Sequence, residues 1–224
     1  MKLVWSPETA LESYLDTIKS CDRLRQSGEA EFIAATAGGW NAKLIVEAWA
    51  PCAPAAAATS VGLSIAARHT GGRHVCVVPN QLSKARYAAS THGFGLPAAP
   101  EVLVGEAEAV LSGLEGVDFL VVDGRRRDLV RVVRSVKVSQ RGAVLVCRNV
   151  RERRVEGFRW DWVVGDGVRV VRSVVLPVER GLDIAYVGHG GGGTGRSKVK
   201  RSERRWVKHI DEGSGEEHLF RRRR

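Results

Sequence analysis

The chain has 224 residues, of which 44% are hydrophobic and 27% charged, and its formal net charge is +10. This length is enough for one globular domain, or one domain with a tail, but is short for two full domains. The longest uncharged stretch, residues 48–67, is mostly Ala, Ser and Thr, so it lacks the ~20 strongly apolar residues of a membrane span. The first residues also lack an apolar signal core, and we expect a cytoplasmic or nuclear protein with no membrane partner.

The sequence predicts a helix from Ser6, because Ser6 can cap the first turn and Pro7 suits the first helical position. Apolar residues then recur at three- and four-residue spacing, which predicts that this helix docks on the domain through one stripe. The stripe consists of Leu11, Tyr14, Leu15, Ile18, Cys21 and Leu24. A second helix is expected from Glu29 to Gly38, where glycine can supply a left-handed end.

Short apolar runs then alternate with helical segments, which predicts a doubly wound α/β fold with a mostly parallel sheet. The expected strands are residues 42–49, 74–78, 101–104, 117–123 and 141–147. The expected helices between them are residues 55–69, 81–90, 106–114 and 129–138. Two last strands, 168–178 and 182–187, are separated by three residues, and this spacing predicts an antiparallel hairpin. Trp160 and Trp162 are expected on a strand or loop, packed in the core.

A glycine-rich segment follows Val187 and indicates a linker. We therefore expect an N-terminal helical segment (1–28), a Rossmann-like domain (29–187) and a linker with a basic, disordered tail (188–224). The tail carries 11 Lys/Arg against 5 Asp/Glu. Part of it, at Lys198–Arg201 and Arg204–Arg205, is similar to a nuclear import signal, although solvated charge is the alternative interpretation.

Neither cysteines nor histidines have the spacing of a metal site. Cys21, Cys52, Cys76 and Cys147 are far apart in the chain, and we expect four free thiols. His69, His74 and His92 are expected at the surface or in turns.

The order of five parallel strands and a closing hairpin resembles class I S-adenosyl-L-methionine-dependent methyltransferases. Residues 31–33, 41–47 and 119–123 look like the cofactor approach and fourth strand of small O-methyltransferases of the caffeoyl-coenzyme A type. The whole chain resembles, more closely, a plant family of methyltransferase-like proteins of unknown function. That second resemblance is carried by residues 1–10, 59–63, 141–144 and 215–220. It implies a Rossmann-like methyltransferase fold and S-adenosyl-L-methionine as the cofactor to consider.

The cofactor loop departs from the methyltransferase pattern. Glu47 keeps the acid expected at the end of the first strand, but the following loop has no glycine and contains Trp49 and two prolines. Asn80 stands where an acid would hold the ribose hydroxyls. We therefore expect weak cofactor binding or none. Any contact is expected from residues at the strand ends, namely Glu47, Asn80, Gly105, Glu106, Ala107 and Asp123.

The metal site of the resembling O-methyltransferases is also altered. Asp123 and Asn149 stand at two expected ligand positions, but Arg148 stands at the third, and a guanidinium cannot ligate a cation. We therefore expect no metal. Arg148 is expected to form an ion pair with Asp123, the alternative being that it points to solvent.

Residues 125–159 carry 12 Lys/Arg against 3 Asp/Glu. Several of these arginines follow predicted strand ends, where α/β sheets bind ligands. They could clamp a phosphate or carboxylate, or could equally be a solvated loop. The candidate basic patch is Arg125, Arg126, Arg127, Arg148, Arg151, Arg153 and Arg154.

Three functions remain in competition. The chain could be an active methyltransferase with an unusual cofactor loop. It could be a methyltransferase fold that has lost its chemistry and serves as a binding or regulatory module for a small molecule or an anion. It could also bind nucleic acid or another polyanion through its Arg-rich segment and tail. The catalytic residues cannot be assigned from the sequence.

Overall fold

The computed structural model describes residues 5–21, 28–50, 54–92, 94, 99–189, 206–210 and 217–221. They fall into two units, residues 1–190 and 191–224. None of the described helices has the length and apolar character needed to cross a membrane.

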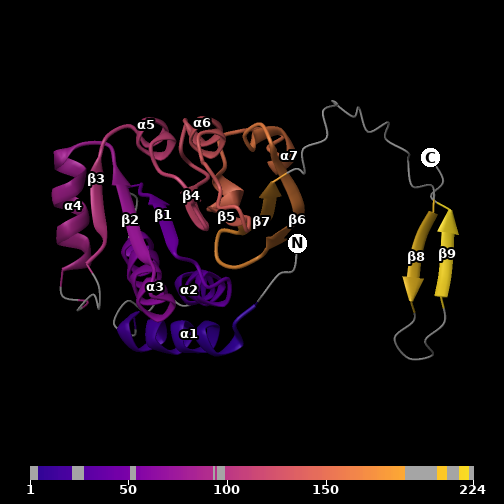
Figure 1. The fold of residues 1–224 in the computed structure, drawn as a ribbon, viewed down its shortest axis with the longest axis horizontal. Coiled ribbons are helices and arrows are strands. Elements are labelled where there is room, and N and C mark those ends of the chain that lie inside the picture. The colour runs from indigo at the N-terminus through magenta and orange to yellow at the C-terminus, as the bar shows by residue number, and fades with distance from the viewer. Residues whose placement is uncertain are drawn as a thin grey trace. The chain divides into compact units, whose positions relative to one another are not determined.

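The larger unit is an α/β sandwich around one seven-stranded sheet (Figure 1). The strand order is β3-β2-β1-β4-β5-β7-β6. The strands are β1 (Leu44–Ala48), β2 (Arg73–Val78), β3 (Glu101–Val104), β4 (Phe119–Asp123), β5 (Ala143–Arg148), β6 (Val168–Leu176) and β7 (Leu182–His189). The first five are parallel, and β7 runs antiparallel between β5 and β6. The predicted fold class and closing hairpin are therefore confirmed.

Helices cover both faces of this sheet (Figure 1). They are α1 (Pro7–Cys21), α2 (Glu29–Gly39), α3 (Pro54–Thr70), α4 (Gln81–Thr91), α5 (Ala107–Ser112), α6 (Leu129–Arg134) and α7 (Trp160–Val163). A 3₁₀ turn, η2 (Val150–Glu152), follows β5. The structure puts Trp160 and Trp162 on helix α7, so their prediction as strand or loop is wrong; Trp160 is buried in the core and Trp162 is 64% exposed.

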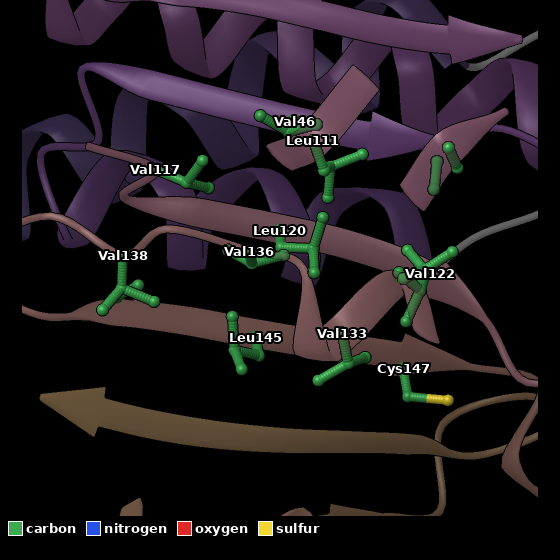
Figure 2. Close-up of a cluster of buried hydrophobic side chains, with 14 of the residues drawn as sticks. Val46, Leu111, Val117, Leu120, Val122, Val133, Val136, Val138, Leu145 and Cys147 are labelled. Carbon is green, nitrogen blue, oxygen red and sulfur yellow. The ribbon is translucent and has the colours of Figure 1, made fainter. Parts of the chain in front are cut away.

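The core has one apolar layer on each face of the sheet. Figure 2 shows the layer on the α5–α6 face, where Leu120 and Leu145 from neighbouring strands lie against Val133 of α6 and Leu111 of α5. Strands β1, β2, β4 and β5 are buried along almost their whole length because helices cover both sides of the sheet, which explains their near-continuous apolar runs. The edge strands β3 and β6 are more exposed. Cys21, Cys76 and Cys147 are buried free thiols, as predicted, and Cys52 lies outside the described residues.

Helix α1 docks through the opposite side from the one the apolar stripe predicts. Leu11, Tyr14, Leu15 and Ile18 are exposed by 39% or more, whereas the buried residues are Ala10, Ser13, Thr17 and Cys21. Of the predicted stripe, Cys21 alone among the described residues is buried; Leu24 lies outside them. Small side chains make this docking possible because they let α1 lie close to its neighbours.

Glycines on α2 complete this close contact. A Cβ added to Gly38 would lie 2.4 Å from the Ser13 Oγ, and one added to Gly39 would lie 2.3 Å from the Trp5 ring. The sequence predicts that these glycines supply a left-handed helix end, and this prediction is wrong. The residue after α2 with the left-handed conformation is Asn41, with φ 53°. Gly38 and Gly39 are instead required by the space that Ser13 and Trp5 occupy.

The smaller unit contains an antiparallel pair, β8 (Trp206–Ile210) and β9 (Glu217–Arg221). The prediction of a wholly disordered tail is therefore wrong for these two segments. The glycine-rich linker and the import-like basic residues lie outside the described residues, apart from Gly188 and His189 at the end of β7.

Candidate functional site

The carboxyl ends of β1, β4 and β5 meet at one edge of the sheet, where a ligand would be expected in this fold. Register puts Asp123, the last residue of β4, opposite Arg148, the last residue of β5. Asp123, Arg148 and the following Asn149 are all buried. The prediction that Asp123, Arg148 and Asn149 lie together at the strand ends is therefore confirmed. Their contacts determine what this edge can bind.

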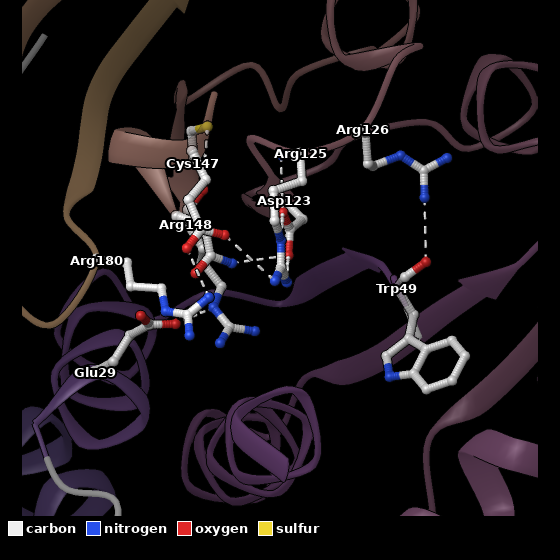
Figure 3. A network of polar contacts seen from close by, with 10 residues as sticks. Glu29, Trp49, Asp123, Arg125, Arg126, Cys147, Arg148 and Arg180 are labelled. Atoms are coloured by element: carbon white, nitrogen blue, oxygen red, sulfur yellow. Dashed lines mark hydrogen bonds and ion pairs between the residues drawn. The ribbon is translucent and has the colours of Figure 1, made fainter. Parts of the chain in front are cut away.

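Asp123 is held by Arg125 rather than by the predicted Arg148 (Figure 3). The Arg125 Nε donates to Oδ1 at 2.9 Å and its Nη2 donates to Oδ2 at 2.6 Å, which is a bidentate pair. The Arg125 backbone N–H and the Asn149 side-chain amide add hydrogen bonds of 2.9 Å and 2.8 Å. Burial alone would raise the pKa of Asp123, but these contacts with Arg125 outweigh it and hold the pKa below its usual value.

Arg148 forms an ion pair with Glu29 at the start of α2 (Figure 3). Both residues are buried, and the charge of Arg148 also helps to lower the pKa of Asp123. The prediction that a protein cation lies at this edge is right, but the assignment of the bidentate arginine to Arg148 is wrong. Glu29 was missed because it lies about 120 residues away in sequence from its partner.

The donor set at this edge does not suit a divalent cation. Mg²⁺ and Ca²⁺ need several free oxygen ligands, whereas both oxygens of Asp123 accept hydrogen bonds from Arg125, and the Asn149 amide is directed at Asp123 through its NH₂ group. Within the described residues, no three His, Cys, Asp or Glu side chains lie close enough to hold a metal ion.

On the neighbouring part of the edge, Arg126 links the end of β4 to the chain that follows β1. Its Nη1 donates to the Trp49 carbonyl oxygen at 3.1 Å (Figure 3). Its Nε and Nη2 form a bidentate pair with Asp128. The Trp49 indole is buried, edge-on to Tyr87 at 5.6 Å. Trp49 and Arg126 therefore join the ends of β1 and β4, the two strands at which the strand order reverses and where open α/β sheets bind ligands. Residues 51–53 of that loop lie outside the described residues.

Glu47 is buried and already has protein partners. Its Oε2 accepts a hydrogen bond of 2.6 Å from the Ser60 hydroxyl and lies 3.5 Å from Nε2 of His74. His74, expected at the surface or in a turn, is buried beside Glu47, with its Nδ1 3.0 Å from the Ser64 hydroxyl. The acid of the first strand therefore belongs to a polar cluster beneath α3.

The remaining predicted cofactor residues are placed at the ends of β2 and β3. Asn80 caps α4, with its Oδ1 accepting from the Ser83 N–H at 2.8 Å. The backbone of Gly105 donates to Val78 at 2.9 Å, Glu106 is exposed, and Ala107 is buried in the core. Glu47 and Asn80, the two predicted cofactor residues considered for polar contacts, therefore each accept a hydrogen bond from the protein itself.

The basic patch divides into paired and unpaired arginines. Arg125, Arg126 and Arg148 pair as described above, and Arg153 donates to Asp183 at 2.8 Å. Asp183 also accepts from the Trp160 indole at 2.6 Å, a contact the sequence reasoning missed. Arg127, Arg151 and Arg154 are exposed, and within the described part of the chain no acid pairs with them. The patch is therefore mostly an internal ion-pair network with three free charges at its surface.

Three solved structures with a similar fold are methyltransferases by their descriptions, and each has low sequence identity to this chain. A methyltransferase from Geobacter sulfurreducens has 16% identity and a TM-score of 0.55, over 77% of this chain and 88% of that one. The S-adenosylhomocysteine-bound methyltransferase PaMTH1 from Podospora anserina has 16% identity and a TM-score of 0.52, over 83% and 89%. A putative caffeoyl-CoA O-methyltransferase from Staphylococcus aureus has 12% identity and a TM-score of 0.52, over 79% and 92%.

These likenesses establish the methyltransferase-like Rossmann fold that the strand order predicts. A comparison with curated protein sequences finds no match. A family model, in contrast, matches residues 1–222, almost the whole chain including the β8–β9 segment. By that match the chain belongs to the family described as protein of unknown function DUF1442.

Proposed function

We propose that this chain is a methyltransferase-fold protein that performs no metal-dependent methyl transfer and binds S-adenosyl-L-methionine weakly or not at all. The observation that carries the proposal is the engagement of Asp123 by Arg125 and Asn149. A positive guanidinium fixed against this carboxylate repels a cation and occupies its ligand atoms. The resemblance further suggests a plant protein.

The cofactor part of the proposal rests on Glu47, Asn80 and Arg126. Glu47 and Asn80 each accept a hydrogen bond from the protein. Arg126, which follows β4, donates to the Trp49 carbonyl, which follows β1. A ligand would have to displace these contacts, and the lost hydrogen bonds would reduce its affinity. S-Adenosylhomocysteine is the ligand to test because the Podospora structure contains it.

Calorimetric titration of the full chain with S-adenosyl-L-methionine and S-adenosylhomocysteine tests this directly. We expect a dissociation constant weaker than about 100 μM for both, equivalent to less than about 5.5 kcal/mol of binding free energy. We also expect no magnesium-stimulated methylation of a catechol. A micromolar or tighter constant that Glu47→Gln abolishes would contradict the cofactor proposal, and magnesium-stimulated turnover would contradict the metal proposal.

A second candidate function, binding of a polyanion such as RNA, is favoured by the three exposed arginines of the patch. Arg127, Arg151 and Arg154 are free to contact phosphates, and the tail adds further charge. Anisotropy titration with a single-stranded RNA should show binding that weakens with salt. Replacing these three arginines by alanine should reduce the logarithmic salt slope by about 2, since each phosphate contact on a single strand contributes roughly 0.7.

A charge-matched control for that experiment replaces Arg73, Arg86 and Arg131, which lie on other elements. An equal loss in both triple variants would show binding driven by net charge alone and would contradict a site at the patch. A chain ending at residue 190 separates the contribution of the smaller unit.

A further inference from the structure

A cavity lies away from the strand-end network, on the α2-covered face of the sheet beside β6 and β7. Its volume is about 760 Å³, within the usual range for small-molecule sites. Four aromatic side chains line it, Trp5, Phe32, Trp40 and Tyr186. None of the strand-end residues described above belongs to its walls.

Three of the four aromatic residues, Trp5, Trp40 and Tyr186, are held by contacts within the protein. Trp5 lies against Gly39, and the neighbouring Ser6 N–H donates to the Gly39 carbonyl at 2.9 Å. Trp40 packs at a tilt of 56° on Tyr186, with their ring centroids 5.8 Å apart. The cavity is therefore preformed, which lowers the cost of ordering a ligand site.

A β-bulge in β6 creates the opposite wall. The register with β7 shifts between Val170 and Arg172. Before the bulge, Val168 and Val170 pack on the α5–α6 face of the sheet, whereas Val174 beyond it packs on the α2 face. The bulge therefore turns Arg172 and Val174 into the cavity wall, where both are lining residues.

The one charged side chain among the described residues that line this cavity, Arg172, favours an anion. Arg172 is the charged residue among those that line the cavity, and no acid pairs with it within the described residues. It lies opposite Tyr186 in register, where its positive charge partly offsets the increase in the pKa of Tyr186 that burial causes. The Trp40 indole nitrogen is buried and has no hydrogen-bond partner among the described residues, although the side chain is only 5% exposed. That nitrogen is not accessible from the cavity, so Arg172 is the group that selects the charge of a ligand.

We propose that this cavity binds a small apolar carboxylate, whose hydrocarbon or aromatic body lies among the four aromatic rings while its acidic group contacts Arg172. The apolar walls exclude a strongly hydrated ligand such as a free nucleotide, because its polar groups would lose water without gaining partners. The single cation selects a monoanion over an amine or a neutral ligand of the same body. This site is independent of the strand-end network and of the function proposed for it.

The test uses the full chain and fluorescence of 8-anilinonaphthalene-1-sulfonate, an apolar aromatic anion, as the reporter. Decanoate should displace the probe more effectively than decylamine of equal chain length. Arg172→Gln should weaken decanoate roughly three- to fivefold, as expected for a partly exposed charge pair, and should leave decanol displacement unchanged. Arg169→Gln, which removes an arginine from the same strand outside the cavity lining, is the matched control and should have no effect.

Val174→Trp should fill the cavity and abolish displaceable probe binding while preserving the far-ultraviolet circular dichroism spectrum. Equal displacement by decanoate and decylamine would overturn the proposal, as would unchanged probe binding in Val174→Trp. Sedimentation velocity distinguishes a second copy of the chain as the occupant. The proposal would also be overturned if the protein does not bind decanoate and instead forms a dimer that Val174→Trp dissociates.

Discussion

Arg148→Ala should lower the free energy of unfolding by about 3–5 kcal/mol, the usual cost of removing one partner from a buried ion pair. Arg148 is 6% exposed and its partner Glu29 is 3% exposed, so water cannot replace the lost guanidinium. Its loss would also remove positive charge from beside Asp123. Urea unfolding monitored by circular dichroism at neutral pH measures the difference.

Arg127→Ala is the matched control because Arg127 is an exposed arginine of the same patch; it should change stability by less than about 0.5 kcal/mol. The double variant Glu29→Leu with Arg148→Leu should recover part of the loss, since it leaves no unpaired buried charge. A cost for Arg148→Ala no larger than that of Arg127→Ala would contradict a buried pair.

Asp118→Asn should cost about 2–3 kcal/mol at neutral pH, because one buried carboxylate supports the start of the central strand β1. Its Oδ2 accepts from the Lys43 and Leu44 backbone N–H groups at 2.8 Å and 3.1 Å, and its Oδ1 accepts from Arg141 at 2.9 Å. An amide keeps one acceptor but loses the charge and the second acceptor. Thermal or urea unfolding measures the loss.

This difference should depend on pH. Burial tends to raise the pKa of Asp118, but hydrogen bonds from Arg141 and from the two backbone amides hold it below the usual value of 3.8. A lowered folded-state pKa stabilises the protein above the unfolded pKa, and that contribution is lost as the pH falls through the folded pKa. The gap between wild type and Asp118→Asn should therefore be constant above about pH 5 and shrink below about pH 4.

Asp166→Asn, at an exposed position, should show neither the loss nor the pH dependence. A gap for Asp118→Asn that stays constant down to pH 2 would mean that the charge of Asp118 contributes nothing to folding.

The inner parallel strands could be predicted because they are buried on both faces, so their apolar runs are continuous and stand out against the helices. Phe119–Asp123 and Ala143–Arg148 were predicted with only small errors at their ends. The short separation of the last two strands also identified the antiparallel pair. These are local signals that depend on few long-range contacts.

The docking face of α1 could not be predicted from hydrophobicity. Ala10, Ser13, Thr17 and Cys21 also follow helical spacing, but small residues carry little apolar signal beside the larger stripe. The residue that allows this face to dock is on another helix: Gly38 of α2 leaves room for Ser13. Nothing within the first helix alone decides between the two faces.

The residues of the candidate site were predicted from the sequence, but their ion-pair partners were not. Strand order brings Asp123 opposite Arg148, yet Arg125 is two residues from Asp123 and reaches both of its oxygens after a tight turn. Arg148 instead pairs with Glu29, a contact between distant parts of the chain. Side-chain pairing among several nearby arginines depends on backbone direction, which the residue pattern alone does not determine.

The edge strand β6 could pair with strands of other molecules, and the β-bulge within it reduces this risk of aggregation. It is nine residues long, rich in valine, and has a neighbour in the seven-stranded sheet on one side alone. A long apolar strand with an open hydrogen-bonding edge is a template for pairing with other molecules. The bulge after Val170 breaks the regular edge, and Arg169 and Arg172 place like charges along it. The same distortion that forms a cavity wall thus also discourages strand-to-strand aggregation.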